Sequence, residues 1–308
     1  MRGRTVPATS SAGTDATSRK RSARNWRFVV AAIILAGLAF QFWRSDPRAL
    51  AALRRPTPGL LVIAVMTGTA SYFLLLEAWR RLRGLREPWR DVGGVWFASL
   101  FARYAPGAIW QGAVRVGSAH IARESKRLVW ERYLAEQALV CFSATTLALA
   151  LVFSMALPVP PALPGALSIV AAGALASAIV APRLGISLQW PLSAVLSMLG
   201  GHVLVALGFA ALVASVSDTI NVVEIASYMV MFLTAAVAGL IAIFAPAGIG
   251  VREAVLAGLL TPKFGVALAI AIAVAARVWL LGCEAIAIAV WRLVSRMHNA
   301  SAGTTGHR

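Results

Sequence analysis

The stretch "FGVALAIAIAVAARVWLLGCEAIAIAVW", residues 264–291, decides the fold. A transmembrane helix needs about 20 consecutive, predominantly apolar residues, and this run exceeds that length. Its only charged residues are Arg277 and Glu284, which lie seven positions apart and therefore share one face of a helix. An arginine at the bilayer centre costs about 3 kcal/mol even on lenient scales. We therefore expect both side chains to face the interior of a helical bundle and to have partners there.

The composition of the whole chain agrees with a transmembrane location for this stretch. Of 308 residues, 59% are hydrophobic and 13% are charged, and the mean hydropathy is +0.76. A soluble domain has roughly a quarter of its residues charged, so these values exclude an ordinary soluble protein. The sequence predicts an all-α polytopic membrane protein.

Apolar runs divide the chain into candidate membrane spans and polar ends. We expect a disordered, basic, cytoplasmic arm over 1–27, a single transmembrane helical domain over 28–296, and a short C-terminal tail over 297–308. The clean apolar runs are 28–43, 59–79, 133–157, 164–181, 189–214, 222–244 and 264–291. If 245–262 also crosses as a broken span, the prediction is about eight transmembrane helices.

Basic residues set the expected orientation. The net charge is +17, and the arginines and lysines flank apolar runs, which is typical of positive-inside signals and of contact with anionic lipid headgroups rather than with nucleic acid. The loops 80–91 and 123–132 are both basic, so we expect 94–117 to dip into the membrane and return to the same side. Residues 123–132 read as an interfacial helix. Both termini are expected in the cytoplasm, in a multi-pass protein of the inner (cytoplasmic) membrane.

Two interrupted segments break the pattern of continuous apolar runs. They are "YAPGAIWQGAVRVG" at 104–117 and "FAPAGIGVRE" at 244–253. Each has an aromatic residue, Ala and Pro, then Gly, Ile and Arg. Short apolar segments interrupted at matching places in two halves of a transporter are a sequence pointer to a binding site made from broken helices, and to an inverted repeat. The residues expected to break these helices are Pro106, Gly107, Pro246, Gly248 and Gly250.

The chemistry of these segments points to an anion site. A helix that restarts near Gly250 leaves backbone N–H groups free and presents the positive end of its dipole. Glu253 in the first turn suits that dipole, whereas Arg252 does not. Arg252 is therefore expected to have an anionic partner, which is Glu253, another carboxylate or a bound phosphate. Alternatively, the Pro-Gly breaks are kinks, Arg252 and Glu253 form an interfacial pair, and Arg115 only begins the cytoplasmic basic stretch.

The candidate lipid- or anion-binding residues are therefore Arg115, Arg252, Glu253, Arg277 and Glu284. We expect no catalytic residues, because the sequence has no triad, phosphate loop or soluble segment large enough for a catalytic domain. No metal site or cofactor is expected, and Cys141 and Cys283 read as small residues of the membrane core. Glu77 and Glu136 read as snorkelling residues near span ends, and His202 as a helix contact.

At these residues the chain resembles the lysylphosphatidylglycerol synthase transmembrane family, which includes the flippase part of the bacterial multiple peptide resistance factor. The resemblance rests on "YAPGAIW" with Arg115, on "ERYLAEQALV" at 131–140, and on "PAGIGVRE" at 246–253, and it covers about 25–295. It implies a helical bundle that moves an anionic or aminoacylated lipid between leaflets. The soluble synthase domain of that family is missing from this sequence, so the resemblance does not carry over synthase activity.

The leading functional expectation is a flippase-like lipid translocase that moves or presents an anionic, aminoacylated or glycosylated lipid across the cytoplasmic membrane. Its expected partners are the membrane and a phospholipid or lipid-linked substrate, not nucleic acid. Two alternatives stay open. One is a membrane subunit that presents a lipid to a separate glycosyl- or aminoacyl-transferase, and the other is a secondary transporter of a small anion.

Overall fold

The structure is a computed structural model that describes residues 56–84, 89–104, 110–118, 124–155, 191–217, 221–242 and 246–305. All of them belong to one compact unit, which spans residues 44–308. The expected arm over 1–27, the expected spans 28–43 and 164–181, and the expected breaks at Pro106 and Gly107 lie outside the described residues.

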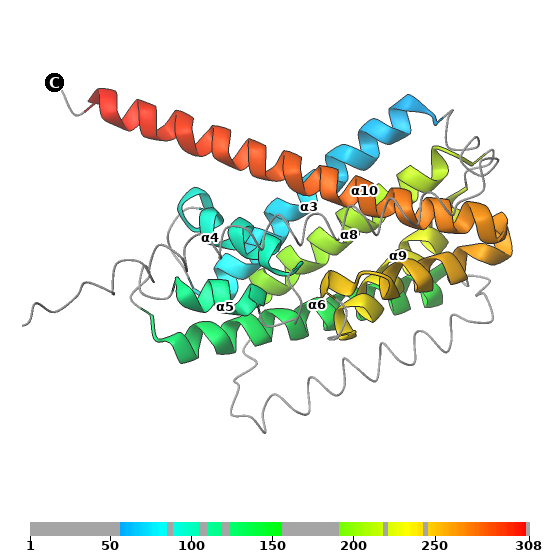
Figure 1. Cartoon of the computed structure of the whole chain (residues 1–308), viewed down its shortest axis with the longest axis horizontal. Coiled ribbons are helices and arrows are strands. Elements are labelled where there is room, and N and C mark those ends of the chain that lie inside the picture. The colour runs from blue at the N-terminus through cyan, green and yellow to red at the C-terminus, as the bar shows by residue number, and fades with distance from the viewer. Residues whose placement is uncertain are drawn as a thin grey trace, which may run out of the picture. The chain divides into compact units, whose positions relative to one another are not determined.

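The regular structure of the described residues is entirely helical (Figure 1). In chain order the elements are α3 (Pro58–Leu82), α4 (Trp89–Ala102), α5 (Trp110–Gly117), α6 (Lys126–Met155), α8 (Leu192–Ala214), α9 (Val222–Ile241), the short 3-10 helix η1 (Pro246–Gly248) and α10 (Val251–Thr305). Five of these helices, α3, α6, α8, α9 and α10, are long and apolar enough to cross a membrane. The chain is thus a multi-pass helical membrane protein. The prediction of eight crossings is not tested by these five.

The observed helices follow the apolar runs closely at some ends and not at others. Helices α3, α8 and α9 match the expected spans 59–79, 189–214 and 222–244 to within a few residues. The structure has no separate interfacial helix over 123–132, because α6 begins at Lys126 and continues through the span. Helix α10 likewise continues through residues 297–305, which the sequence assigned to a tail.

Helices α3 and α8 form a closely packed antiparallel pair. The pairing is close because glycines on α8 face α3. A Cβ added at Gly208 would lie 3.0 Å from the carbonyl oxygen of Ala64, and one at Gly201 would lie 2.8 Å from the side chain of Leu75. Small residues let transmembrane helices approach closely enough for dispersion forces to hold them together without a hydrophobic driving force.

Helix α10 is two antiparallel limbs rather than one straight rod. Residues 253 and 277 would lie about 36 Å apart along a continuous helix, yet Glu253 Oε1 and Arg277 Nη1 are 3.6 Å apart. The chain reverses at Gly265, whose φ of 71° and ψ of 162° are almost restricted to glycine. We name residues 251–264 the first limb and 266–305 the second limb; both are visible in orange and red in Figure 1.

A similar reversal joins α4 to α5. The Nε of Arg115 donates a hydrogen bond to the hydroxyl oxygen of Ser99 at 3.0 Å, although the two residues are 16 positions apart. A straight helix would separate them by about 24 Å. Helices α4 and α5 therefore fold back on each other.

The described helix ends gather into two groups at opposite ends of the bundle. At one end the Thr57 N–H donates to the carbonyl of Ser215 at 2.9 Å, and Glu224 pairs with Lys263. The other end holds most of the basic residues, where Arg83 pairs with Glu124 and Arg132 donates to the carbonyl of Leu82. Trp291 packs against Gly93 at the start of α4. The described parts of the basic stretches 80–91 and 123–132 thus lie together.

Candidate functional site

The site is built around the chain break between α9 and α10. Three of the four positions from 247 to 250 have a positive φ, which is 50° at Ala247, 68° at Gly248 and 87° at Gly250. Glycine adopts this region at little energetic cost, whereas the same backbone conformation is unfavourable for Ala247. At Gly248 the chain also passes so close to α9 that an added Cβ would lie 2.7 Å from the carbonyl oxygen of Gly239.

The first limb of α10 begins directly after this break and uses its own glutamate as a cap. The backbone N–H of Gly250 donates to Glu253 Oε2 at 2.7 Å, and the N–H of Ala254 donates to the carbonyl of Gly250 at 2.9 Å. A carboxylate in the first turn also interacts favourably with the helix dipole. Glu253 is buried and therefore satisfies a backbone donor that lipid could not satisfy.

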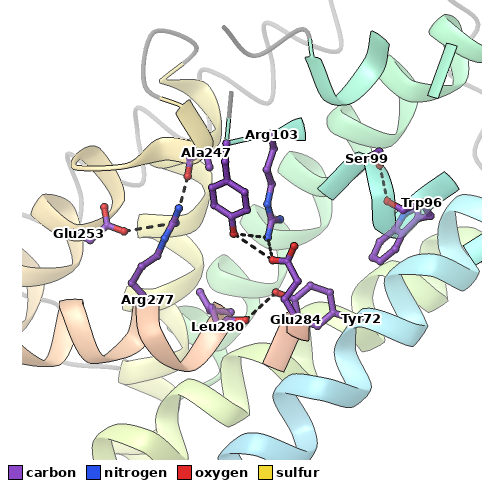
Figure 2. A network of polar contacts seen from close by, with 10 residues as sticks. Tyr72, Trp96, Ser99, Arg103, Ala247, Glu253, Arg277, Leu280 and Glu284 are labelled. Carbon is purple, nitrogen blue, oxygen red and sulfur yellow. Dashed lines mark hydrogen bonds and ion pairs between the residues drawn. The ribbon is translucent and has the colours of Figure 1, made fainter. Parts of the chain in front are cut away.

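Arg277 joins the second limb to this capped start. Its Nη1 lies 3.6 Å from Glu253 Oε1 and donates to the carbonyl oxygen of Ala247 at 3.4 Å (Figure 2). The side chain is 5% exposed, and its Nε and Nη2 have no hydrogen-bond partner in the described part of the chain. A buried guanidinium with two unused donors is costly, because each unpaired polar group forfeits the hydrogen bonds that water would supply.

Glu284, two turns further along the second limb, holds the end of α4. Its Oε2 forms an ion pair with Arg103 and accepts a hydrogen bond from the Tyr104 hydroxyl at 3.2 Å. Arg103 also donates to the Tyr104 hydroxyl, at 3.1 Å. The Tyr72 hydroxyl on α3 donates to the carbonyl of Leu280 at 3.4 Å, one turn before Glu284 (Figure 2). Three helices, α3, α4 and α10, thus meet at this carboxylate.

Tyr104 links the two charged groups to each other. The guanidinium carbon of Arg277 lies 5.4 Å from the centroid of the Tyr104 ring, which is within the range of cation–π attraction. Tyr104 is the last described residue before the segment that contains Pro106. Arg277 therefore contacts both Tyr104, which precedes the first expected break, and Ala247, which lies in the second.

Arg252 lies beside this cluster and is stabilised differently. Its guanidinium carbon is 4.6 Å from the centroid of the Phe232 ring, near the middle of the apolar helix α9. It is within electrostatic reach of Arg277, Glu253 and Arg103. No carboxylate of the described residues lies within ion-pair distance of it. The carboxylate partner predicted for Arg252 is thus not found among the described residues.

The cluster has an excess of positive charge. Arg103, Arg252 and Arg277 contribute three positive charges, and Glu253 and Glu284 contribute two negative charges, which leaves one positive charge uncompensated. Burying an unpaired charge in a medium of low dielectric constant costs several kcal/mol (about 3 to 5). We name these five residues the central charge cluster.

Arg115 belongs to a different group. Its guanidinium pairs with Glu136 on α6, donates to Ser99, and lies 5.1 Å from the Trp79 ring centroid and 5.3 Å from that of Tyr133. Both members of the pair are buried, with 1% and 6% of their side chains exposed. Glu136 is therefore a buried partner rather than a snorkelling residue, and this pair fastens α5 to α6.

Four of the five expected anion-binding residues, Arg252, Glu253, Arg277 and Glu284, thus lie in the central charge cluster, and Arg115 lies outside it. Arg103 was not among the predicted site residues, although it lies in the interrupted segment 94–117. Its signal was present: Arg103 and Tyr104 directly precede the Pro106–Gly107 break. His202 forms a 3.0 Å hydrogen bond with Ser143 on α6, as expected of a helix contact.

Groups of His, Cys, Asp or Glu arranged to hold a metal ion are not found among the residues that the structure describes. Cys141 and Cys283 are buried and unpaired. Comparisons of the chain with protein-family models, with curated proteins and with solved structures found no match.

Proposed function

We propose that the protein is a flippase-like lipid translocase, which moves or presents an anionic, aminoacylated or glycosylated lipid across the cytoplasmic membrane. The observation that carries the proposal is the central charge cluster: three arginines and two glutamates gathered at a chain break among apolar helices. Ionisable residues at membrane depth are expensive and usually mark a path for a polar or charged substrate.

The anionic headgroup is the part of the lipid that this cluster suits. Arg252 has the aromatic face of Phe232 on one side and no carboxylate within ion-pair distance among the described residues. Arg277 has two donors without partners in that part of the chain. Guanidinium groups bind phosphate oxygens through short, charge-assisted hydrogen bonds, and the start of a helix adds favourable electrostatic potential. In this proposal Arg252 and Arg277 hold the headgroup while the acyl chains stay in the bilayer.

The glutamates would then act as exchangeable internal partners. Glu253 and Glu284 hold Arg277 and Arg103 when the site is empty, so that the guanidinium groups are never left entirely unpaired in a medium of low dielectric constant. A headgroup that takes over Arg277 releases its contacts with Glu253 and with the Ala247 carbonyl, which join the second limb of α10 to the first limb and to the chain break. A change in these contacts would couple headgroup binding to movement of the helices.

The test is lipid translocation by purified, full-length protein in liposomes that contain fluorescent headgroup-bearing anionic lipids. We expect the wild type to accelerate exchange between leaflets and Arg252→Ala to lose most of that acceleration. Arg127→Ala is the matched control, because Arg127 is 80% exposed and forms only a surface pair with Glu131. Equal exchange by the wild type and Arg252→Ala would reject the site. Uptake of a soluble anion without lipid movement would instead favour a small-anion transporter.

The resemblance to the lysylphosphatidylglycerol synthase transmembrane family supports the same proposal. The matching residues of "PAGIGVRE" form the break and the start of α10, so they include Arg252 and Glu253. We propose membership of that family, without the synthase activity that its name describes. An assay for lipid aminoacylation by the purified chain, with aminoacyl-tRNA supplied, is expected to yield no modified lipid, and a modified lipid would overturn this part of the proposal.

A further inference from the structure

The pair formed by Arg103 and Glu284 is asymmetric in its surroundings. The side chain of Glu284 is 4% exposed and sits within a continuous helix, whereas that of Arg103 is 31% exposed and follows the last residue of α4. Glu284 is therefore fixed by the second limb of α10. Arg103 lies at a helix end with a long, flexible side chain, so it can change partner without moving α10.

Both members of the pair also have unused hydrogen-bonding capacity. Glu284 Oε1 and Arg103 Nε are buried atoms with no hydrogen-bond partner in the described part of the chain. The observed contact to Glu284 is through one guanidinium nitrogen and one carboxylate oxygen. This leaves the pair incompletely satisfied.

We propose that Arg103 is a third cationic ligand of the headgroup site and that Glu284 is its internal competitor. This inference rests on the function proposed above and adds the residue that changes partner. When an anion enters, Arg103 leaves Glu284 for the anion, and Tyr104, which donates to the same carboxylate oxygen at 3.2 Å, keeps Glu284 hydrogen-bonded. The exchange needs no covalent step.

The charge of the cluster limits which anion fits. With three arginines and two glutamates, an anion of one net negative charge brings the cluster to neutrality. A dianion would leave it negative, and a net-neutral headgroup would leave the original positive charge uncompensated. The charge count therefore favours a monoanion, and among lipid headgroups a singly charged phosphodiester meets this requirement. Such a group is found in phosphatidylglycerol as a lipid and in dimethyl phosphate as a soluble anion, and the experiment separates these two sources.

The two residues of the pair should have opposite effects on binding, and this distinguishes competition from a structural role. Removing the competitor with Glu284→Gln frees Arg103 and strengthens binding, whereas Arg103→Gln removes a ligand and weakens it. We expect changes of roughly tenfold in each direction, the size of an ordinary coupling between two sites. A purely structural pair would give the same sign for both variants, because either change leaves a buried partner uncompensated.

The experiment measures binding of phosphatidylglycerol to the purified full-length protein by native mass spectrometry, with phosphatidylcholine as the net-neutral lipid and dimethyl phosphate as the soluble competitor. The variants are Glu284→Gln, Arg103→Gln, Arg103→Lys and Arg252→Gln. Glu224→Gln and Arg127→Gln are the matched controls, since they remove the same charges from pairs away from the cluster. Thermal unfolding of each variant shows that it is folded.

The expected result is tighter phosphatidylglycerol binding by Glu284→Gln, weaker binding by Arg103→Gln with partial rescue by Arg103→Lys, and little binding of phosphatidylcholine. Equal weakening by Glu284→Gln and Arg103→Gln would overturn the competition while leaving the proposed site intact, provided that Arg252→Gln also weakens binding. Unchanged binding by Arg252→Gln would instead overturn the site itself. Displacement by dimethyl phosphate without any lipid binding would assign the site to a soluble phosphodiester and overturn its lipid occupant.

Discussion

Single residues at the chain break show how tightly the backbone defines this site. Gly248 combines a φ of 68° with a close approach to Gly239, so both its conformation and its lack of a side chain are needed. The sequence identified Gly248 and Gly250 as helix breakers from the Pro-x-Gly-x-Gly pattern. It could not identify the approach to Gly239, because that contact joins segments whose relative position depends on tertiary packing.

Replacing Gly248 by alanine should therefore destabilise the protein. The added Cβ would lie 2.7 Å from the Gly239 carbonyl oxygen, and the left-handed conformation alone costs about 1 to 3 kcal/mol for a non-glycine residue. We expect a clear fall in the midpoint of thermal unfolding in detergent. Gly258→Ala is the matched control, because no atom lies within 4 Å of its added Cβ and helical alanine is favoured. Equal midpoints for the two variants would contradict the predicted strain.

The buried pair between Arg115 and Glu136 allows a second prediction at this scale. Arg115→Gln removes the charged partner of a glutamate whose side chain is 6% exposed, and breaking such a pair costs about 3 to 5 kcal/mol. We expect a large loss of thermal stability that added salt does not reduce, since burial shields the pair from ions. Arg127→Gln, which removes a surface pair, should leave stability nearly unchanged. A small effect of Arg115→Gln would indicate that Glu136 gains another partner.

At the scale of elements, hydropathy predicted the bounds of α3, α8 and α9 closely but misplaced the start of α6. The runs 59–79, 189–214 and 222–244 became α3, α8 and α9 because apolar length alone decides whether a segment can cross lipid. The basic stretch 123–132 was wrongly separated from its span. Charged residues and Trp130 resemble an interfacial helix, but continuous backbone hydrogen bonding carries α6 through them, and Arg132 reaches the Leu82 carbonyl instead of the membrane surface.

The reversal within α10 depends on Gly265 and gives a prediction for the element. Its φ of 71° with ψ of 162° belongs to a region that only glycine enters readily, so Gly265→Ala should cost about 1 to 3 kcal/mol. The cost should appear as lower thermal stability and as weaker contact between the limbs, measured by the distance between spin labels at exposed sites on each. Gly282→Ala, in the straight part of the second limb, is the control. An unchanged distance and stability would contradict the hinge role.

At the scale of the whole molecule, the described parts of the basic stretches 80–91 and 123–132 lie at one end of the bundle. Arg83, Glu124 and Arg132 meet the end of α3, and Trp291 reaches the start of α4. Counting basic residues could predict this grouping because each loop contributes independently to orientation. It could not predict the central charge cluster, since Arg103, Glu253 and Glu284 come together only after α4 and both limbs of α10 have packed.

The orientation itself can be tested with thiols, because Cys141 and Cys283 are buried and should react little. Met297 is 65% exposed beyond Trp291, at the end of the bundle that holds the basic residues, and Val222 is 66% exposed at the opposite end. The reagent is a membrane-impermeant maleimide that reaches the outer face of the cytoplasmic membrane in intact cells. We expect it to label Val222→Cys in intact cells and to label Met297→Cys only after permeabilisation. The positive-inside distribution of arginine is the physical reason. Labelling of Met297→Cys but not Val222→Cys in intact cells would show that the orientation is the reverse of the predicted one. The start of the first limb of α10 would then be approached from the opposite side of the membrane.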